Sequence, residues 1–568
     1  MRSYFAALAS LLLAGCAPAV SAPPAVPTLP ADLVLRGGKV FLADQAGTVV
    51  EALAIRGDEV VAAGTSTEVS RHLGPDTEVM ELRGRLVTPG FNDAHIHFAP
   101  GGVSLLNLDL LGTTSLAEIE RLVVERVRTA APGEWIQGRG WDHTRLPARE
   151  LGPGGWPTAG ALDRAAPNNP VVLSRVDGHV VWANSRAMEA ARIGPATEPP
   201  AGGEIVRDPA TGEATGVFLE SAQALIERYL PDPSPATLRR GIEAAMELAA
   251  SSGVTSVQTS ASAEELRVYR ELQGAGELTV RVYAWRPLGH EVIEGFRQLG
   301  IGAGFGDAWL RTGLVKGYAD GTLGSRTAYM LEPFADDADN RGLPQYSQAE
   351  LDSLVLAADA AGLQVIVHAI GDAANRMVLD AFERAARVNG SRERRHRVEH
   401  AQVLDARDIP RFAGLGVIAS MQPTHATSDM RWAEDRLGPE RAREGAYAWR
   451  SLLEAGAALA FGTDFPVEPM RPVEGIYSAV TRQSREDPGT PPGGWLPGQR
   501  LSRAEAIRLY TAGSAYSEWE ETRKGTLEPG MLADLVLWSD DLLTAPAAQI
   551  LKAEPVLTVV GGRVVYRQ

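Results

Sequence analysis

The chain has 568 residues, of which 45% are hydrophobic and 22% charged, so it can bury a large core and has room for more than one structural unit. The formal net charge is −16 and basic residues form no long stripe, so no nucleic-acid partner is expected. Cys16 is the single cysteine, which excludes an intrachain disulfide.

The N-terminus carries the pattern of a bacterial lipoprotein signal peptide. Arg2 precedes an apolar run over residues 4–14 that is too short to span a bilayer, and "LAGC" follows, ending at Cys16. The resemblance of "LAGC" to a lipobox implies cleavage before Cys16 and attachment of lipid to its sulfur. We therefore expect residues 1–15 to be removed as a signal peptide.

Residues 16–30 are rich in proline and alanine, which predicts an extended tether. The lipid on Cys16 would hold the mature protein at the bacterial cell envelope, on the periplasmic side. Ala17 follows the cysteine, so an acidic signal for retention at the inner membrane is missing. The outer membrane is therefore slightly favoured over the inner membrane.

Both ends of the remaining chain show the pattern of short strands. Alternating apolar residues and glycine-containing turns fill residues 31–88, as in "VVEALAIRGDEVVAAG". Residues 511–568 show the same pattern and end in "PVLTVVGGRVVYRQ". We expect the two ends to form one small β-sandwich, with residues 31–88 as its N-terminal part and residues 511–568 as its C-terminal part.

The long middle of the chain, residues 89–510, alternates short apolar runs with helical patterns, which predicts a parallel α/β structure. Eight of these runs have the character of strands, and eight βα units predict a (β/α)8 barrel. The gap between the first and second runs is too long for a simple crossover, so about residues 131–235 are expected to form an inserted subdomain. The eight runs lie at residues 85–98, 253–260, 278–285, 309–321, 363–372, 396–402, 416–425 and 458–467.

Polar residues follow five of these strands, at the end where the reactive groups of such a barrel lie. His95 and His97 are one residue apart, so on a strand their side chains point the same way. Burial of an imidazole or a carboxylate without a partner would be costly, and a shared cation would remove that cost. The complete set is His95, His97, Lys316, His368, His400 and Asp464.

The motifs around these residues resemble the amidohydrolase superfamily, and most closely amidohydrolase family 3, which includes N-substituted formamide deformylases. The resemblance runs from about residue 31 to the C-terminus and rests on "PGFNDAHIHF", "KGYADGTLGSRTA", "VHAIGDAAN", "RVEHAQ", "MQPTHATSDM" and "GTDFPVEP". It implies that His95, His97, His368 and His400 bind one or two divalent metals, usually zinc. It also implies that Asp464 is both a ligand and the proton carrier. Such ligands admit manganese, iron or cobalt as well.

Lys316 sits where binuclear members of the family carry a carboxylated lysine that bridges two metals. A free ammonium cannot ligate a cation, so Lys316 has to be carbamylated, be neutral, or stay away from the metal, and the bridging role requires the carbamate. The alternative is one metal, with Lys316 turned aside or bound to substrate. A bound metal lowers the pKa of its water from about 15.7 to about 7 and polarises the substrate carbonyl. We therefore expect hydrolysis of a C–N amide-type bond of a small molecule, with Asp464 as the proton shuttle.

Three further residues are candidates for binding the substrate. His179 belongs to the insertion, in "RVDGHVVWANS", a segment that the family motif places over the barrel mouth. A plain turn at Asp177 explains the same pattern as well. Asp320 in "YADG" and His425 in "QPTH" are expected to line the pocket. Tryptophans that could form its apolar walls are Trp141, Trp182 and Trp432.

Two other functions stay open on the sequence alone. The same site serves hydrolases of cyclic imides, carbamates or esters. A lipid-anchored protein that binds metal or a ligand without turnover belongs to a different class, although such a protein would not need Asp464 as a proton carrier. The oligomeric state is open as well, with a homo-oligomer as one outcome.

Overall fold

The computed structural model describes residues 29–568. The predicted signal peptide, Cys16 and most of the predicted tether fall in residues 1–28 and lie outside the described residues. Within the described part of the chain, no helix combines the length and the apolar character needed to cross a bilayer.

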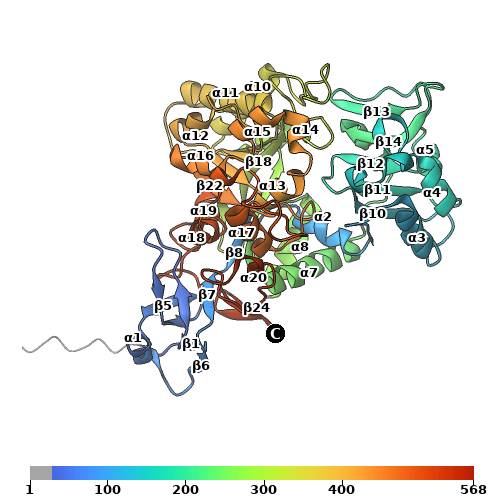
Figure 1. Cartoon of the computed structure of the whole chain (residues 1–568). Coiled ribbons are helices and arrows are strands. Elements are labelled where there is room, and N and C mark those ends of the chain that lie inside the picture. The colour runs from blue at the N-terminus through green and yellow to red at the C-terminus, as the bar shows by residue number, and fades with distance from the viewer. Residues whose placement is uncertain (1–28) are drawn as a thin grey trace, which may run out of the picture.

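A nearly closed barrel of eight parallel strands forms the centre of the molecule, where β8, β18 and β22 are labelled in Figure 1. The strand order is β8-β15-β16-β18-β19-β20-β21-β22. The edge strands β22 and β8 lie against each other, and beyond β22 the backbone N–H of Asp464 donates to the carbonyl of His95 at 2.8 Å. Seven strands fall within the segments predicted from the sequence and β16 extends two residues beyond its segment, which confirms the (β/α)8 barrel. They are β8 (Phe91–Ile96), β15 (Val254–Ser260), β16 (Arg281–Pro287), β18 (Leu310–Tyr318), β19 (Gln364–Ala369), β20 (Arg397–His400), β21 (Ile418–Met421) and β22 (Ala458–Phe461), and the short β17 (Phe305–Gly306) pairs with β18.

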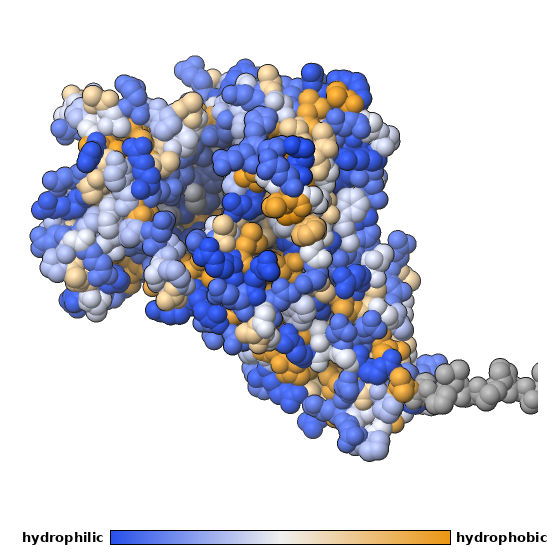
Figure 2. Space-filling view, turned by 180° about the vertical axis from the view of Figure 1, so that it is seen from behind, coloured by the Kyte–Doolittle hydropathy of each residue, from blue (hydrophilic) through white to orange (hydrophobic). Residues whose placement is uncertain are grey.

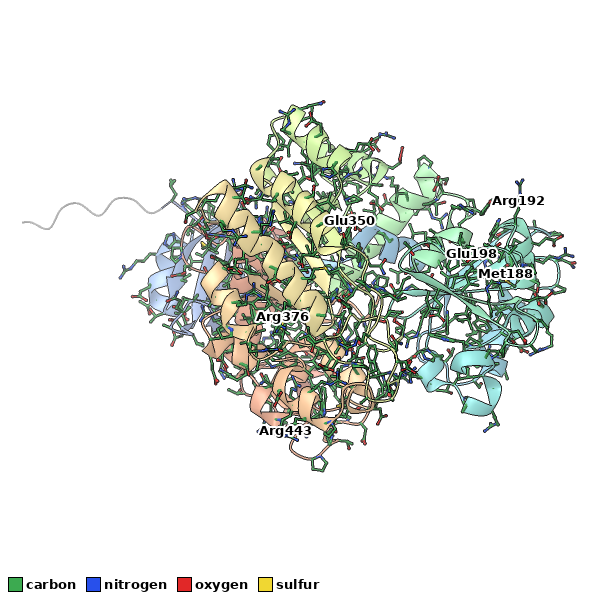
Figure 3. The ribbon with its side chains drawn as sticks, turned by 90° about the horizontal axis from the view of Figure 1, so that it is seen from above. Met188, Arg192, Glu198, Glu350, Arg376 and Arg443 are labelled. Carbon is green, nitrogen blue, oxygen red and sulfur yellow. The ribbon has the colours of Figure 1, made fainter. Side chains whose placement is uncertain are left out.

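Helices cover the outside of the barrel between its strands. Ser347 and Glu350 form a capping box at the start of α10 (Gln348–Ala360), which turns buried leucine and valine side chains toward the core. The next helix, α11 (Asp372–Asn389), packs beside α10, and Glu350 and Arg376 mark the two helices in Figure 3. The other helices of this part are α2 (Phe98–Ser104), α7 (Pro235–Ser252), α8 (Ala263–Gly274), α9 (His290–Gln298), α12 (Ile409–Leu415), α13 (Pro423–Asp429), α14 (Ala433–Leu437), α15 (Pro439–Gly445), α16 (Trp449–Glu454), α17 (Pro472–Thr481), α18 (Arg503–Leu509) and α20 (Ala547–Ile550).

The inserted subdomain is a separate lobe beside the barrel, and Met188, Arg192 and Glu198 mark it in Figure 3. Its sheet has the order β9-β10-β11-β12-β14-β13. It begins at β9 (Leu108–Asp109), earlier than the predicted residue 131, because β9 pairs with β10 and α3 packs on α4. The later elements are α3 (Leu116–Val127), β10 (Ile136–Trp141), α4 (Ala159–Ala165), β11 (Val171–Arg175), β12 (Val180–Ala183), α5 (Ser185–Ala190), β13 (Gly203–Arg207), β14 (Ala214–Glu220) and α6 (Ala224–Glu227).

Two sheets at the other end of the molecule form the predicted β-sandwich. One sheet, in the order β5-β4-β1-β6, comes from the N-terminal part alone, and the other, in the order β25-β24-β23-β7-β2-β3, combines both termini. Leucine and valine side chains of the two sheets share one core. The elements are β1 (Leu33–Arg36), β2 (Lys39–Phe41), β3 (Val49–Val50), β4 (Ala52–Arg56), β5 (Glu59–Gly64), α1 (Ser66–Val69), β6 (Glu78–Glu81), β7 (Leu86–Pro89), β23 (Leu535–Trp538), β24 (Pro555–Val560) and β25 (Arg563–Arg567).

One helix of the segment assigned to the sandwich belongs to the barrel instead. This helix, α19 (Ala512–Ser517), contacts β8 and β22. Gln364, the first residue of β19, donates to the carbonyl of Ser517 at 2.8 Å. The helix therefore covers the N-terminal end of the barrel by satisfying polar groups there, at the end opposite to the predicted site.

Candidate metal centre

His95 and His97 bring two imidazoles to the C-terminal end of β8. His95 is fully buried, and its ring stacks on that of Trp285, with ring centroids 5.0 Å apart and an interplanar angle of 9°. His97 follows the strand, and its side chain is 28% exposed. The Nε2 atoms of His95 and His97 lie 3.6 and 3.4 Å from Oδ1 of Asp464. The spacing of one residue thus places both rings at a single carboxylate.

Asp464, just after β22, lies between two groups of imidazoles. Its Oδ2 atom is 3.7 Å from Nε2 of His425 and 4.0 Å from Nδ1 of His400. The ligand atoms of His95, His97 and Asp464 lie within 4.8 Å of one another, and so do those of His400, His425 and Asp464. One carboxylate belongs to both groups, an arrangement that suits either one cation or two.

The electrostatics of this cluster favour an ionised Asp464 and neutral imidazoles at His95 and His400. Burial favours the neutral form of Asp464, but His97, His95 and His400 hold its pKa well below the ordinary value. Burial lowers the pKa of His95 to about 4 and that of His400 well below its ordinary value. Neutral imidazoles and an ionised carboxylate are the forms that bind a metal.

Glu399 of β20 holds the ring of His95 from the other side. Nδ1 of His95 lies 2.7 Å from Oε2 of Glu399, and Nε of Arg397 donates to Oε1 of Glu399 at 2.7 Å. Burial opposes ionisation of Glu399, but Arg397 and His95 lower its pKa to about 2. An ionised Glu399 favours the proton on Nδ1 of His95, so Nε2 is left to face Asp464. Glu399 was not predicted from the sequence, although a charged residue inside the buried strand "RVEH" was a signal for it.

Lys316 of β18 enters the same cluster. Its Nζ atom lies 2.9 Å from Nε2 of His95 and 4.6 Å from the ring centroid of Tyr318, and the residue is only 3% exposed. The amine therefore contacts the nitrogen of His95 that faces Asp464. A cation on His95 would need the same lone pair, so loading of the site requires Lys316 to move or to change its charge.

The ring of His368, on β19, packs against the ring of His400 in the cluster. The ring centroids of His368 and His400 are 4.6 Å apart, whereas Nε2 of His368 lies 3.0 Å from the carbonyl oxygen of Gly321. Asp320, which was expected to line the pocket, lies 3.4 Å from the same nitrogen. Its fully buried carboxylate also accepts three backbone N–H groups of the loops after β18 and β19. Asp320 therefore fixes the loops around His368.

His179 reaches the barrel mouth from the inserted lobe. Its Nδ1 atom lies 2.7 Å from Oε2 of Glu220, and its ring centroid is 5.2 Å from that of His368. Burial acts to lower the pKa of His179, but the Glu220 carboxylate raises it to about 9. The hydroxyl of Thr322 donates to Oδ2 of Asp177 at 3.0 Å, which ties the lobe to the barrel beside this histidine.

Two cavities open beside the cluster, and Asp177, His179 and Val467 line both of them. His400 lines the first cavity, which has a volume of about 460 Å³. His97 lines the second cavity, which has a volume of about 650 Å³. A hollow between the inserted lobe and the barrel is visible in Figure 2. These three residues therefore border both cavities at the mouth of the barrel.

The predicted tryptophan walls are only partly present. Trp432 lines the first cavity. Trp141 and Trp182 lie fully buried in the core of the inserted lobe, so the prediction that they face the pocket was wrong. Large aromatic side chains were needed there because the lobe has to bury a core of its own. Trp285, which the sequence analysis missed, is the tryptophan that contacts the cluster.

The atoms at the centre of the cluster fit a divalent cation. Oδ1 of Asp464 and Nε2 of His425 are buried and make no well-aligned hydrogen bond within the described residues. Such atoms are costly to bury unless a ligand satisfies them. Imidazole nitrogens combined with a carboxylate suit zinc, and also manganese, iron or cobalt.

Comparison with known proteins agrees with this geometry. Residues 78–566 match the sequence model of the amidohydrolase family. The chain belongs to this family. LONG AFTER FAR-RED 3 from Arabidopsis thaliana is 33% identical over 553 residues, which cover 94% of this chain and 92% of the relative. YtcJ from Bacillus subtilis (strain 168) is 33% identical over 542 residues, covering 94% and 99%. The N-substituted formamide deformylase of Arthrobacter pascens is 27% identical over 568 residues, covering 94% and 98%.

Solved structures of similar shape belong to metal-dependent hydrolases. An uncharacterized metal-dependent hydrolase from Pyrococcus horikoshii OT3 superimposes with a TM-score of 0.72 at 28% identity, covering 91% of this amidohydrolase and 99% of that chain. A second one, from Pyrococcus furiosus, gives a TM-score of 0.68 at 31% identity, covering 90% and 100%. The predicted amidohydrolase resemblance is therefore confirmed, and these relatives support hydrolase activity.

Proposed function

We propose that this amidohydrolase cleaves a C–N amide-type bond of a small molecule with the help of a divalent metal. The observation that carries the proposal is the ionised, buried carboxylate of Asp464, which two groups of imidazoles share and which lines a cavity. A relative that acts on N-substituted formamides supports an amide as the substrate.

Zinc is the first choice for the metal, as one ion or two. His95 and His97 would hold it on one side of Asp464, and His400 and His425 on the other, with His368 packed against His400. A divalent cation bound here supplies a Lewis acid that polarises the substrate carbonyl and activates water.

The protein's own contribution to the reaction is proton transfer and positioning. Asp464 is ionised at neutral pH, so it accepts a proton from the water that attacks the carbonyl carbon. The same carboxylate then delivers that proton to the leaving nitrogen as the C–N bond breaks. The products are a carboxylic acid and an amine. Asp464 is only 4% exposed, which limits the exchange of this proton with bulk water.

Removal of two ligands tests the metal assignment. We expect the double variant H95A/H97A to lose most of its bound metal, measured by elemental analysis, and at least about 100-fold in hydrolysis, because two imidazoles of one group are absent. His290 is an exposed histidine at the start of α9, so H290A is the matched control and should keep both. Unchanged metal stoichiometry in H95A/H97A would rule out this set of ligands.

A substrate screen separates the remaining functions. The zinc-loaded protein is incubated with N-substituted formamides, other N-acyl amines, a cyclic imide, a carbamate and an ester, and released amine and acid are measured. We expect amine release from the amides. Release from the imide, carbamate or ester alone would replace the amide by another bond. Full metal occupancy without turnover of any compound would favour a binding protein.

A further inference from the structure

Arg139 of the inserted lobe extends toward the barrel beside the metal centre. Its guanidinium donates from Nη2 to the carbonyl of Val176 at 2.6 Å and from Nη1 to the carbonyl of Pro466, which follows Asp464 by two residues. It lines the second cavity together with His97. The arginine therefore lies at the boundary between the lobe, the loop after Asp464 and the cavity.

The guanidinium of Arg139 has no carboxylate partner among the described residues. The structure gives it two hydrogen bonds, both to carbonyl oxygens, whereas a guanidinium has five N–H donors. Burial lowers the pKa of Arg139 to about 10, against the attraction of Asp464 and Asp177. The half-buried charge thus has no ion pair among the described residues, and three of its five N–H groups have no acceptor there.

The carboxylates that line this cavity are already bound. Asp177 contacts Arg175 and Thr322, and Glu220 contacts His179. Asp320 accepts backbone N–H groups, as described above. Each acidic side chain of the second cavity therefore has a partner in the protein, and the charge left for a ligand to neutralise is the positive charge of Arg139.

The two cavities at the mouth of the barrel also limit which substrates fit. The two cavities meet at Asp177, His179 and Val467, and the metal cluster borders both. A substrate whose scissile carbonyl lies at the cluster has room for one substituent on each side. A formamide, with only hydrogen on its acyl carbon, would fill one cavity and leave the other without substrate.

We propose that the substrates are amides with a substituent on both sides of the scissile bond, and that Arg139 binds a carboxylate or similar anionic group on the arm in the second cavity. The inference rests on the proposed amide hydrolysis and names the class of substrate. The planar fork of an arginine matches a carboxylate in two parallel hydrogen bonds. A site built for such contacts discriminates strongly against an analogue that lacks the anion.

Matched substrate pairs test the anion on each arm. On the amine side, 4-acetamidobenzoate is compared with the neutral 4-acetamidoacetophenone. On the acyl side, N-succinyl-4-nitroaniline is compared with neutral N-levulinoyl-4-nitroaniline. With the zinc-loaded protein we expect kcat/KM to be at least tenfold higher for the charged member of one pair. In R139Q, kcat/KM for the charged member and kcat/KM for the neutral member should differ by no more than about threefold.

Binding supplies a readout that does not depend on turnover. Titration calorimetry with the same compounds should show the charged member binding at least tenfold more tightly to the native protein, with the difference lost in R139Q. If no amide is hydrolysed but this binding difference is present, the proposed function fails and the anion site stands. If amides are hydrolysed without preference for charge in rate or binding, the anion site fails and the proposed function stands.

Two further variants, R149Q and R139K, separate recognition of the anion by Arg139 from a purely structural role of this residue. Arg149 of the inserted lobe is 82% exposed at its side chain and lines neither cavity, so R149Q makes the same change of charge and should keep the native ratio. An equal loss for charged and neutral substrates in R139Q would show that Arg139 only braces the lobe, and would overturn the inference. If R139Q does not fold, R139K decides. A lower ratio supports recognition by the arginine fork, and an unchanged ratio contradicts it.

Discussion

The backbone of the metal centre is strained at single residues. His400, Ala401 and Asp464 have φ values of 73°, 43° and 60°, in the left-handed region that non-glycine residues seldom adopt. Each such residue costs about 1–3 kcal/mol, which the surrounding barrel has to offset. Two of the three carry ligand atoms of the proposed centre. The strain therefore turns these side chains toward a common point that regular strand geometry would not give.

Lys316 is the residue whose state decides the number of metals. We expect it to be carbamylated in the loaded protein, because a free amine contacts His95 where a cation would bind, and the carbamate is an anionic ligand able to bridge two ions. K316A should then lose metal and activity, and added bicarbonate or a short carboxylic acid should partly restore both. Elemental analysis and hydrolysis rates measure the two effects.

A different result for K316A would contradict the bridging role of Lys316. Full metal loading of K316A, with no response to bicarbonate, would show that this lysine is not a bridge. One metal per chain in the native protein, with Lys316 turned aside or bound to substrate, would then be the correct description.

At the scale of elements, the position of His97 depends on how closely two helices pack. His97 is the residue before α2, and α2 packs on α7 through two glycines. A Cβ on Gly241 of α7 would lie 2.7 Å from the backbone nitrogen of Val103, and one on Gly102 would lie 2.0 Å from the carbonyl oxygen of Gly241. The contact is therefore made by backbone against backbone and leaves no room for a methyl group.

We expect G241A to push α2 away from α7 and to displace His97 with it. The overpacked contact should lower the free energy of unfolding by about 1–3 kcal/mol. The misplaced imidazole should lower hydrolysis by at least about tenfold, because small displacements in a catalytic site have large effects on rate. Urea unfolding and steady-state kinetics measure the two quantities.

Gly295 gives the matched control for this helix contact. It lies in α9, where an added Cβ would meet nothing within 4 Å. G295A should therefore leave hydrolysis unchanged and stabilise the protein by about 0.5–1 kcal/mol, as expected for glycine to alanine in a helix. Native activity in G241A would show that the close approach of α2 and α7 does not position His97.

At the scale of the whole molecule, a buried ion pair joins the sandwich to the barrel. Arg281 of β16 donates from Nε and Nη2 to both oxygens of Asp534, at 2.7 and 2.9 Å, and both side chains are nearly inaccessible. Burial acts to raise the pKa of Asp534, but the Arg281 charge and its hydrogen bonds lower it below the ordinary value. The pair therefore stabilises the protein in its ionised form.

The sign of the pH dependence follows from this lowered pKa. The contribution of the pair is complete above the ordinary carboxyl pKa of about 4 and is lost as the pH falls below it. D534N should cost about 3–5 kcal/mol at pH 7, because Arg281 keeps its buried charge without a partner. Its stability should also fall less than that of the native protein between pH 5 and pH 3. Urea unfolding across this range measures both effects, and the exposed Asp76 provides D76N as the control.

We propose that lipid on Cys16 anchors the mature protein to the bacterial envelope, through a tether that ends before the β-sandwich. The support is "LAGC" behind a short apolar run, in residues outside those described. With C16A expressed in a bacterial host, we expect the protein to leave the membrane fraction, because two or more acyl chains are needed for stable anchoring. Membrane association that persists in C16A would contradict the tether.

The strands of the barrel could be predicted because each is a short apolar run, and a polar residue where such a run ends is visible in the sequence. His95, His97, Lys316, His368, His400 and Asp464 were found in this way, since the C-terminal ends of parallel strands meet at one face. The start of the insertion was not found, because the helical pattern of α3 fits a barrel helix as well as one in a lobe.

The sequence by itself determined the order of the strands, the candidate ligands and the resemblance to the amidohydrolase family, because these depend on local pattern and on short motifs. Only the tertiary structure decided that Glu399 orients His95, that His425 shares Asp464 with His400, and that Arg139 enters a cavity beside His97. Each of these facts is a distance between segments far apart in the chain. Such distances are set by how the lobe and the loops pack on the barrel, and the residue types at either end do not encode them individually.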